Sequence, residues 1–112
     1  MKDDRVYIEH IQASINKIAL YILGMDRKAF SSDTLVQDAV VRQLEIIGEA
    51  TKRISKKLKE ENPQVPWSDM AGMRDVLIHD YIDVDHDIVW RTASESIGEL
   101  KELINKVNDP NR

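Results

Sequence analysis

The sequence predicts an all-α protein, an antiparallel bundle of four to five helices, and two observations support this fold class. Apolar residues recur every three or four positions along most of the chain, which is the spacing of one face of a helix. No segment shows the alternation of apolar and polar residues that is typical of a half-buried strand. A chain of 112 residues is close to the common size of one domain, so we expect a single helical domain over residues 1–112.

The first two helices are indicated by stripes of aliphatic side chains. Isoleucines at helical spacing predict a helix over about residues 4–23, and Gly24 is a typical residue at which a helix stops. Residues 31–33 (Ser-Ser-Asp) offer N-caps for a second helix, whose stripe extends from Val36 to Leu58. This helix has a second apolar face, which predicts that it has neighbours on two sides.

Two prolines between residues 62 and 66 interrupt the helical pattern. Ser68 is then expected to be the N-cap of a short third helix, with Asp69 in its first turn. A fourth helix is predicted from about Asp87 to Val107. The sequence therefore places three long helices and one short helix around a common core.

The aromatic residues and the charges of the second helix are expected to serve the fold. Trp67 and Trp90 are predicted to be core or interface anchors, and Tyr7 and Tyr21 to be packing residues. The charged side chains of the second helix are predicted to form interhelical pairs or to face solvent, with a role in shaping a cleft as the alternative: Arg42, Glu45 and Glu49.

Composition excludes several classes of protein. The chain has no Cys, so it has no disulfide framework and no thiolate metal site. Its net charge of −4 argues against a broad basic surface for nucleic acid, so any RNA must bind at a local site that carries arginine. No apolar run approaches the roughly 18 residues of a membrane span, and the N-terminus does not resemble a signal peptide. We therefore expect a cytoplasmic protein that is not held in a membrane.

Side chains suited to catalysis gather between Arg74 and Tyr81. A histidine side chain ordinarily titrates near physiological pH, which makes His79 a candidate for general acid and base catalysis. Arg74 carries a permanent charge on a planar fork that binds phosphate through two hydrogen bonds. This combination favours the chemistry of phosphate esters.

Helix geometry restricts how this segment can work. Arg74 and His79 are five residues apart, which places them about 140° apart around an ideal helix. Asp75 lies one turn from His79 and is a neighbour that can orient the imidazole ring. His79 falls roughly opposite the apolar stripe of the third helix, which predicts a groove or an interface for it. Two copies of the segment across a two-fold axis would complete such a site, so we expect a homodimer.

A metal site is the competing reading of the acidic stretch that follows. Asp83, Asp85 and Asp87 imitate the start of a calcium loop. The imitation fails because Ile88 occupies the position of the required Gly and Ser94 that of the required Glu. Helix capping and solvation explain these carboxylates better, and we expect neither a metal nor a cofactor.

The segment from Met73 to Tyr81 closely resembles the signature of the HepT-like toxins of the HEPN superfamily. The family pattern is an Arg, four residues, a His, one residue and a Tyr, and all three positions match. Further blocks are similar to that family at residues 4–8, 39–50, 65–67 and 84–90, so the resemblance covers nearly the whole chain.

This resemblance implies a helical homodimer that places two motifs at a shared cleft and acts as a metal-independent endoribonuclease. It also implies the toxin half of a toxin–antitoxin pair, whose antitoxin is a minimal nucleotidyltransferase that transfers AMP to the motif tyrosine. By position, Arg74 and His79 would be catalytic and Tyr81 would be adenylylated. The spacing of Tyr81 from Leu77 also predicts a packing role for this tyrosine, which is compatible with modification. Asp75 departs from the Asn common in these sequences, and it places a carboxylate beside the phosphate site, where it would repel RNA.

A second functional hypothesis belongs to a different class of protein. In that reading the chain is a non-catalytic helical partner, which docks on a nucleotidyltransferase and serves as its adenylylation substrate. Both hypotheses predict a dimer and the same partner. They differ on RNA, because only a toxin needs His79.

Overall fold

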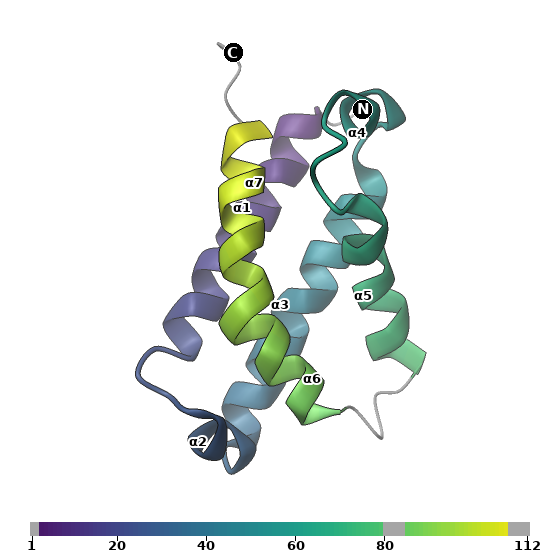
Figure 1. The fold of residues 1–112 in the computed structure, drawn as a ribbon. Helices are drawn as coiled ribbons and strands as arrows, with labels where there is room; N and C mark the ends of the chain where they lie inside the picture. Colours follow the sequence, from purple (N-terminus) through teal and green to yellow (C-terminus); the bar gives the residue numbers. More distant parts are fainter. Residues whose placement is uncertain (1–2, 80–84, 108–112) are drawn as a thin grey trace.

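The computed structural model describes residues 3–79 and 85–107, with the backbone alone for residues 74–79. Every regular element in these two ranges is a helix, as the sequence predicts (Figure 1). The long stretches alternate in direction, so the bundle is antiparallel. The helices, in chain order, are α1 Asp4–Tyr21, α2 Arg27–Ser31, α3 Thr34–Arg53, α4 Lys56–Glu61, α5 Trp67–His79, α6 His86–Arg91, the π-helical turn η1 Thr92–Ser96 and α7 Ile97–Val107.

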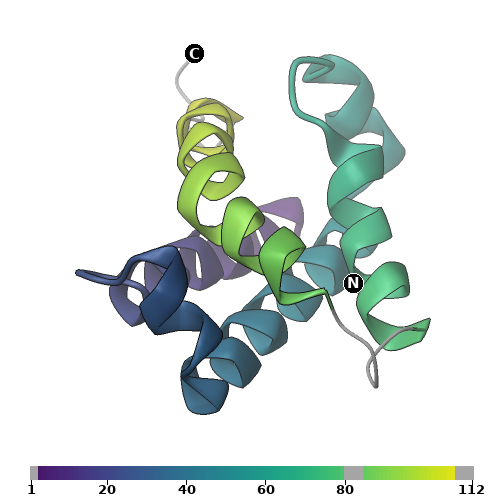
Figure 2. The same cartoon turned by 60° about the horizontal axis from the view of Figure 1, so that its bottom comes forward.

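The helix α3 is the central element of the bundle. It packs against α1 on one side and against α5 on another, and it also contacts α2 and α6. Figure 2 shows α3 passing between these neighbours, with α6 crossing over it. The predicted pair of neighbours is therefore confirmed. The apolar stripe of α3 is buried through Val40, Leu44 and Ile47.

The ends of α1 and α3 are fixed by side-chain caps. Asp3 caps α1, and Asp33 caps α3 by accepting a hydrogen bond from the Val36 N–H at 3.0 Å. Gly24 lies beyond the end of α1 with a φ of 78°, a left-handed conformation that favours glycine. Ser32 does not cap α3, because its hydroxyl donates back to the Lys28 carbonyl of the short helix α2.

The predicted second helix is shorter than its apolar stripe. The chain leaves α3 at Ile54, which has an extended backbone, and Ser55 then caps α4. The prediction of one helix through Leu58 is therefore wrong at this point. Asp4 fixes the break, because its carboxylate accepts hydrogen bonds from the Ser55 N–H at 2.8 Å and the Ser55 hydroxyl at 2.6 Å.

The predicted fourth helix is confirmed as one continuous helical stretch over α6, η1 and α7. Its middle turn has π-helical hydrogen bonding, and such turns are inserted into α-helices as local bulges. Val89, Ala93 and Ile97 of this stretch are buried and face the core. The apolar register that predicts the helix is thus preserved through the bulge.

Both tryptophans are anchors, as expected. Trp67 is 9% exposed and belongs to the core, while the ring of Trp90 packs against Phe30 with centroids 5.3 Å apart. Phe30 is fully buried although it lies on the five-residue helix α2. This small helix therefore covers the lower end of the bundle.

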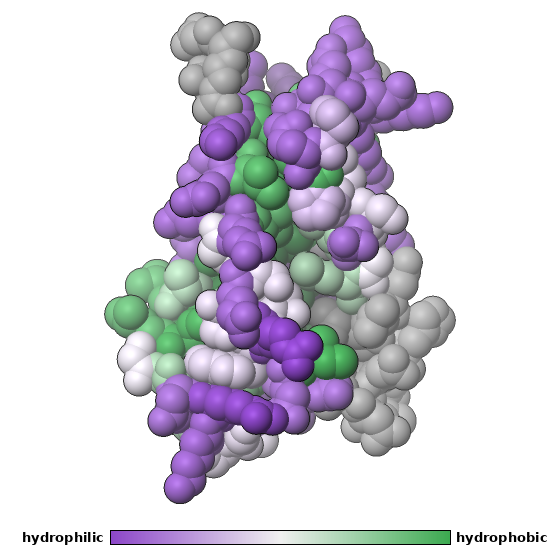
Figure 3. Space-filling view, in the orientation of Figure 1, coloured by the Kyte–Doolittle hydropathy of each residue, from purple (hydrophilic) through white to green (hydrophobic). Residues whose placement is uncertain are grey.

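The surface is mainly hydrophilic, with apolar side chains exposed at a few places. Figure 3 shows one such place at the left, where α1 ends and the chain turns toward α2. Leu20 in the last turn of α1 and Leu23 just beyond that helix are 69% and 78% exposed. Within residues 3–79 and 85–107, no helix has the length and apolar character that crossing a membrane requires.

Candidate functional site

The helix α5 carries three of the four site residues that the sequence predicts. Arg74, Asp75 and His79 lie on it, and the helical backbone extends to His79. The Arg74–His79 separation of about 140° and the Asp75–His79 spacing of one turn therefore apply. Tyr81, the predicted modification site, lies outside the described residues.

The start of α5 is fixed by contacts on the turn that precedes it. The indole N–H of Trp67 donates to the Asn62 carbonyl at 3.0 Å, and the Met70 N–H donates to the Pro66 carbonyl at 3.0 Å. Helix α5 begins at Trp67, so the prediction of Ser68 as its N-cap is wrong by about two residues. Asp69 lies in the first turn, as expected. These contacts hold the helix that presents the motif.

The helix that follows the motif is fixed just as firmly at its start. Asp85 caps α6 by accepting hydrogen bonds from the Asp87 and Ile88 N–H groups. Asp87 in turn forms an ion pair with Arg27 of α2, with Nη2 and Oδ2 at 2.7 Å. The hydrogen bond from Arg27, and then its positive charge, lower the pKa of Asp87 below the ordinary value of 3.8.

The same contacts account for two carboxylates of the acidic stretch that resembles a calcium loop. Asp85 and Asp87 have capping and pairing roles, and Asp83 lies outside the described part of the chain. Over residues 3–73 and 85–107, where side chains are described, no three His, Asp or Glu side chains gather closely enough to hold a metal ion.

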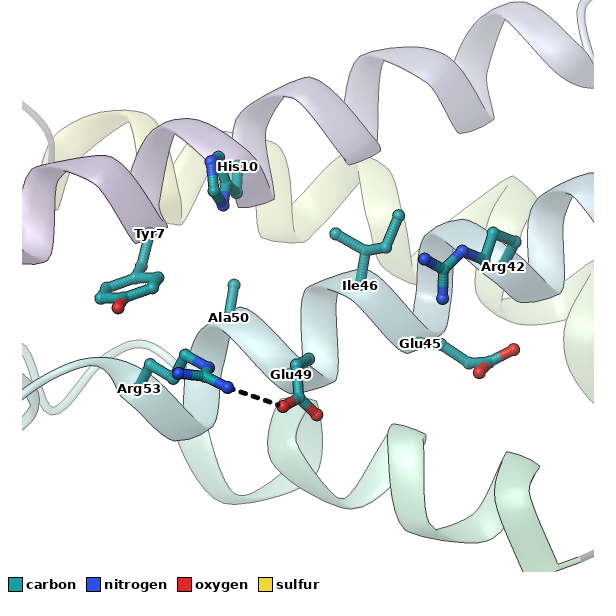
Figure 4. Close-up of a pocket in the computed structure, with 8 residues that line it drawn as sticks. All are labelled: Tyr7, His10, Arg42, Glu45, Ile46, Glu49, Ala50 and Arg53. Atoms are coloured by element: carbon teal, nitrogen blue, oxygen red, sulfur yellow. Dashed lines mark hydrogen bonds and ion pairs between the residues drawn. The ribbon is translucent and has the colours of Figure 1, made fainter. Parts of the chain in front are cut away.

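A polar groove lies between α1 and α3, with a volume of about 430 Å³. Figure 4 shows Tyr7 and His10 entering it from α1, above the side chains of α3. The α3 residues that line it are Arg42, Glu45, Ile46, Glu49, Ala50 and Arg53. The charged residues for which the sequence offers a role in shaping a cleft (Arg42, Glu45 and Glu49) thus line a groove together with Arg53. The contribution of Tyr7 and His10 from α1 has no signal in the sequence.

Two charges of the groove are engaged with each other, and two others are not. Arg53 and Glu49 are 3.5 Å apart, one turn from each other on α3. Arg42 and Glu45 make no hydrogen bond or ion pair with the side chains that the structure describes. The rings of Tyr7 and His10 meet edge to face, with centroids 6.2 Å apart.

A second, more apolar hollow shows how α3 and α5 are aligned. It has a volume of about 340 Å³ and is lined by Leu44 of α3, by Gly72 and Met73 of α5, and by Ile88 and Val89 of α6. The α5 residues of this hollow extend from Ser68 to Met73, so Leu44 lies alongside the first two turns of α5, just before Arg74. Because α3 and α5 run in opposite directions (Figure 1), Arg42 lies about 3 Å further than Leu44 toward the motif-bearing half of α5.

Comparisons with known proteins place this arrangement in a family. The family model described as "Ribonuclease HepT-like" matches residues 11–107. A protein of Caldanaerobacter subterraneus named "Putative RNase TTE0752" is 39% identical over 107 residues, which cover 96% of this chain and 96% of that protein. The "Probable ribonuclease HepT" of Thermococcus cleftensis is 42% identical over 101 residues, covering 90% of this chain and 92% of that protein.

A third relative is also named as a ribonuclease. "Putative RNase MJ0125" of Methanocaldococcus jannaschii is 38% identical over 106 residues, which cover 95% of this chain and 91% of that protein. No solved structure was found to match the chain. The family match spans α3, α5 with its Arg–His motif, and the final helix, and on this basis the chain belongs to the HepT-like ribonuclease family.

Proposed function

We propose that this protein is an endoribonuclease toxin that cuts RNA in the cytoplasm without a metal ion, through Arg74 and His79. The observation that carries the proposal is the family match over residues 11–107, which contains an Arg and a His at the motif spacing on one helix. The names of the relatives, which describe ribonucleases, support the same class of reaction.

The proposed reaction uses the ribose next to the broken bond. His79 removes the proton from the 2′-hydroxyl, and the 2′-oxygen forms a bond to the adjacent phosphorus. The bond from phosphorus to the 5′-oxygen breaks, which leaves a 2′,3′-cyclic phosphate and a 5′-hydroxyl. Arg74 stabilises the negative charge that develops on the phosphoryl oxygens. An imidazolium protonates the leaving oxygen.

In a homodimer, His79 of the partner subunit would be the imidazolium that protonates the leaving oxygen. The positions of Arg74 and His79 diverge by about 140° on one helix, so a single copy presents them in different directions. In a two-fold dimer, Arg74 of one protomer and His79 of the partner subunit would face the same phosphate. A homodimer interface on the α5 side of the bundle is therefore part of the proposal.

Tyr81 is proposed as the point of control. A minimal nucleotidyltransferase antitoxin would transfer AMP to its phenol, with loss of pyrophosphate from ATP. The added group is bulky and anionic, and it would exclude RNA from the motif by its size and by charge repulsion.

The test is cleavage of a small structured RNA in the presence of a chelator. We expect wild type to cleave it and Arg74→Ala and His79→Ala to be slower by at least about 100-fold. His86→Ala, which changes an exposed histidine at the start of α6, is the matched control and should cleave like wild type. Equal cleavage by all four proteins, or an absolute need for a divalent metal, would refute the proposed mechanism.

The second candidate is a non-catalytic partner of the nucleotidyltransferase. It is favoured by the carboxylate of Asp75 beside the motif, which opposes RNA binding. The two functions separate in cells that express this chain alone. Growth arrest that depends on His79 in those cells supports the toxin. Normal growth there, together with adenylylation of Tyr81 once the nucleotidyltransferase is co-expressed, supports the partner.

A further inference from the structure

We propose that the groove between α1 and α3 is a subsite for an unpaired stretch of RNA, with Arg42 on a phosphate and the ring of Tyr7 against a base. This inference rests on the proposed ribonuclease function. It adds the residues that would hold the RNA outside the Arg74–His79 motif.

The position of the groove fits a strand that also reaches the motif. Leu44 lies alongside the first two turns of α5, and Arg42 lies one half-turn further along α3 in the direction of the motif. In Figure 4, Arg42 and Tyr7 mark opposite ends of the groove. Ala50, which lies beside Tyr7 in Figure 4, is eight positions from Arg42, and this corresponds to roughly 12 Å along an ideal helix. A phosphate near the motif and a base further along the groove can therefore belong to one short stretch of RNA.

The charges of the groove suit a nucleotide because a nucleotide combines an anion with uncharged N–H donors. Arg42 is exposed and has no acidic partner among the described side chains, so its fork is available to a phosphate. Glu45 is half-buried and likewise unpaired within residues 3–73 and 85–107. Its carboxylate can accept hydrogen bonds from the exocyclic amine of a base, a common form of base recognition.

The aromatic side chains supply the remaining part of such a subsite. Tyr7 is half-buried, and its ring is held edge to face against His10 at an interplanar angle of 88°. Unpaired bases are commonly bound by stacking on an aromatic ring, which works for every base. Ala50 and Ile46 form an apolar floor beside the tyrosine.

A peptide is a poorer fit to the same groove. A run of acidic side chains would meet Glu45 and Glu49, and a run of basic ones would meet Arg42 and Arg53. A nucleotide can instead place its phosphate at Arg42 and turn an uncharged base toward Glu45. A second copy of the chain would pair arginines with glutamates across a two-fold axis. That occupant makes a different prediction, because changing the groove would then dissociate the dimer.

The decisive measurement is binding of a short fluorescein-labelled single-stranded RNA to the His79→Ala protein, followed by anisotropy at several salt concentrations. For single strands, each neutralised phosphate contributes about 0.7 to the slope of log K against log salt. We expect Arg42→Ala in this background to make the slope shallower by about 0.7. Lys101→Ala removes an exposed charge from α7, away from the groove, and should leave the slope unchanged.

Tyr7 is tested by a pair of substitutions in the same background. Tyr7→Leu should weaken binding roughly tenfold without changing the salt slope, because it removes stacking and no phosphate contact. Tyr7→Phe keeps the ring and should bind like the parent protein. Circular dichroism establishes that each variant is folded.

Three results would overturn the subsite. The first is no RNA binding by the His79→Ala protein, and the second is an equal salt slope with and without Arg42. The third is dissociation of a dimer by Arg42→Ala, seen by sedimentation, which would assign the groove to contact between copies. Failure of the wild type to cleave any RNA would instead refute the proposed function, and the binding data would still decide on the groove.

Discussion

Arg27 of α2 and Asp87 of α6 form a two-point ion pair, with Nη2 to Oδ2 at 2.7 Å and Nε to Oδ1 at 3.1 Å. The two residues are 60 positions apart in the sequence. The pair ties the first turn of α6 to α2, and α6 is the helix that resumes the chain after the motif. Beneath it, Phe30 of α2 packs on Trp90 of α6. Helix α2 therefore supports the far end of the segment that carries the predicted modification site.

The ion pair predicts a dependence of stability on acid. The pKa of Asp87 is lowered from 3.8 in the folded state, so the folded state favours the ionised carboxylate more than the unfolded chain does. The stabilising contribution is thus present above about pH 4 and is lost as the pH falls through the folded pKa. Urea unfolding should show wild type slightly more stable than Asp87→Asn at pH 7 and equal to it in strong acid. The gain is small because both side chains are more than half exposed.

Asp38→Asn is the control for this comparison. Asp38 is exposed on α3 and makes no ion pair with the side chains that the structure describes. Its substitution should leave the difference from wild type the same at both pH values. A difference for Asp87→Asn that stays constant from neutral pH to strong acid would contradict the assigned role of the pair.

Phe30→Ala should destabilise the protein by about 3–5 kcal/mol, because it leaves a cavity under α2. The side chain is 0% exposed, so the substitution removes apolar contacts around the whole of the phenyl ring. Leu35→Ala is the matched control, since Leu35 is 79% exposed and its substitution should change the free energy of unfolding by less than about 0.5 kcal/mol. Denaturation in urea measures both. A loss for Phe30→Ala as small as that for Leu35→Ala would mean that α2 does not cover the core.

Two buried glutamines on α3 should respond in opposite ways to the same substitution. The side-chain oxygen of Gln43 is buried without a hydrogen-bond partner among the residues that the structure describes, so Gln43→Met should stabilise the fold by about 1 kcal/mol. The Gln37 side chain donates to the carbonyls of Phe30 and Ser31, and Gln37→Met should destabilise by about 1–3 kcal/mol. Thermal unfolding ranks the three proteins. Destabilisation by Gln43→Met would mean that a bound water satisfies this oxygen.

The long helices could be predicted because each repeats its apolar spacing over several turns. The stripes of α1 and α3 and that of the final helical stretch are buried where the sequence places them. Helix α2 has five residues, too few for a repeat of the apolar spacing. The local sequence offers Asp26 as a cap and Phe30 as a large apolar residue, and the burial of Phe30 depends on the rest of the fold. The break at Ile54 is hidden for a different reason. Ile54 is buried and Leu58 packs on the same core, so the stripe continues although the helix ends.

One part of the candidate site can likewise be predicted from the sequence, and the other part cannot. The spacing of Arg74 and His79 is local, and the sequence is sufficient to place both on one helix. The groove depends on the packing of α1 against α3, which brings Tyr7 and His10 over residues more than thirty positions away. No local pattern signals such a meeting. The functional reading of Arg42 and Glu45 therefore needs the fold, while that of the motif does not.

Asp75 gives the last prediction, because its spacing to His79 is one helical turn and its charge opposes the substrate. Asp75→Asn removes one negative charge beside the proposed phosphate site and keeps the size of the side chain. At an effective dielectric constant near 20, two unit charges about 6 Å apart interact by about 3 kcal/mol, and screening by water and salt reduces this repulsion. We expect Asp75→Asn to raise kcat/KM for RNA cleavage several-fold at low salt, with a smaller gain at high salt.

The matched control is Asp69→Asn, which removes the same charge from the first turn of the same helix, about 9 Å further along its axis. It should change cleavage much less, and a general effect of net charge would change both variants equally. Steady-state kinetics at two salt concentrations separate these cases. A lower kcat/KM for Asp75→Asn would show that the carboxylate assists the reaction, as expected of a group that holds the His79 ring in its active orientation. An unchanged kcat/KM would contradict the predicted repulsion of RNA by Asp75.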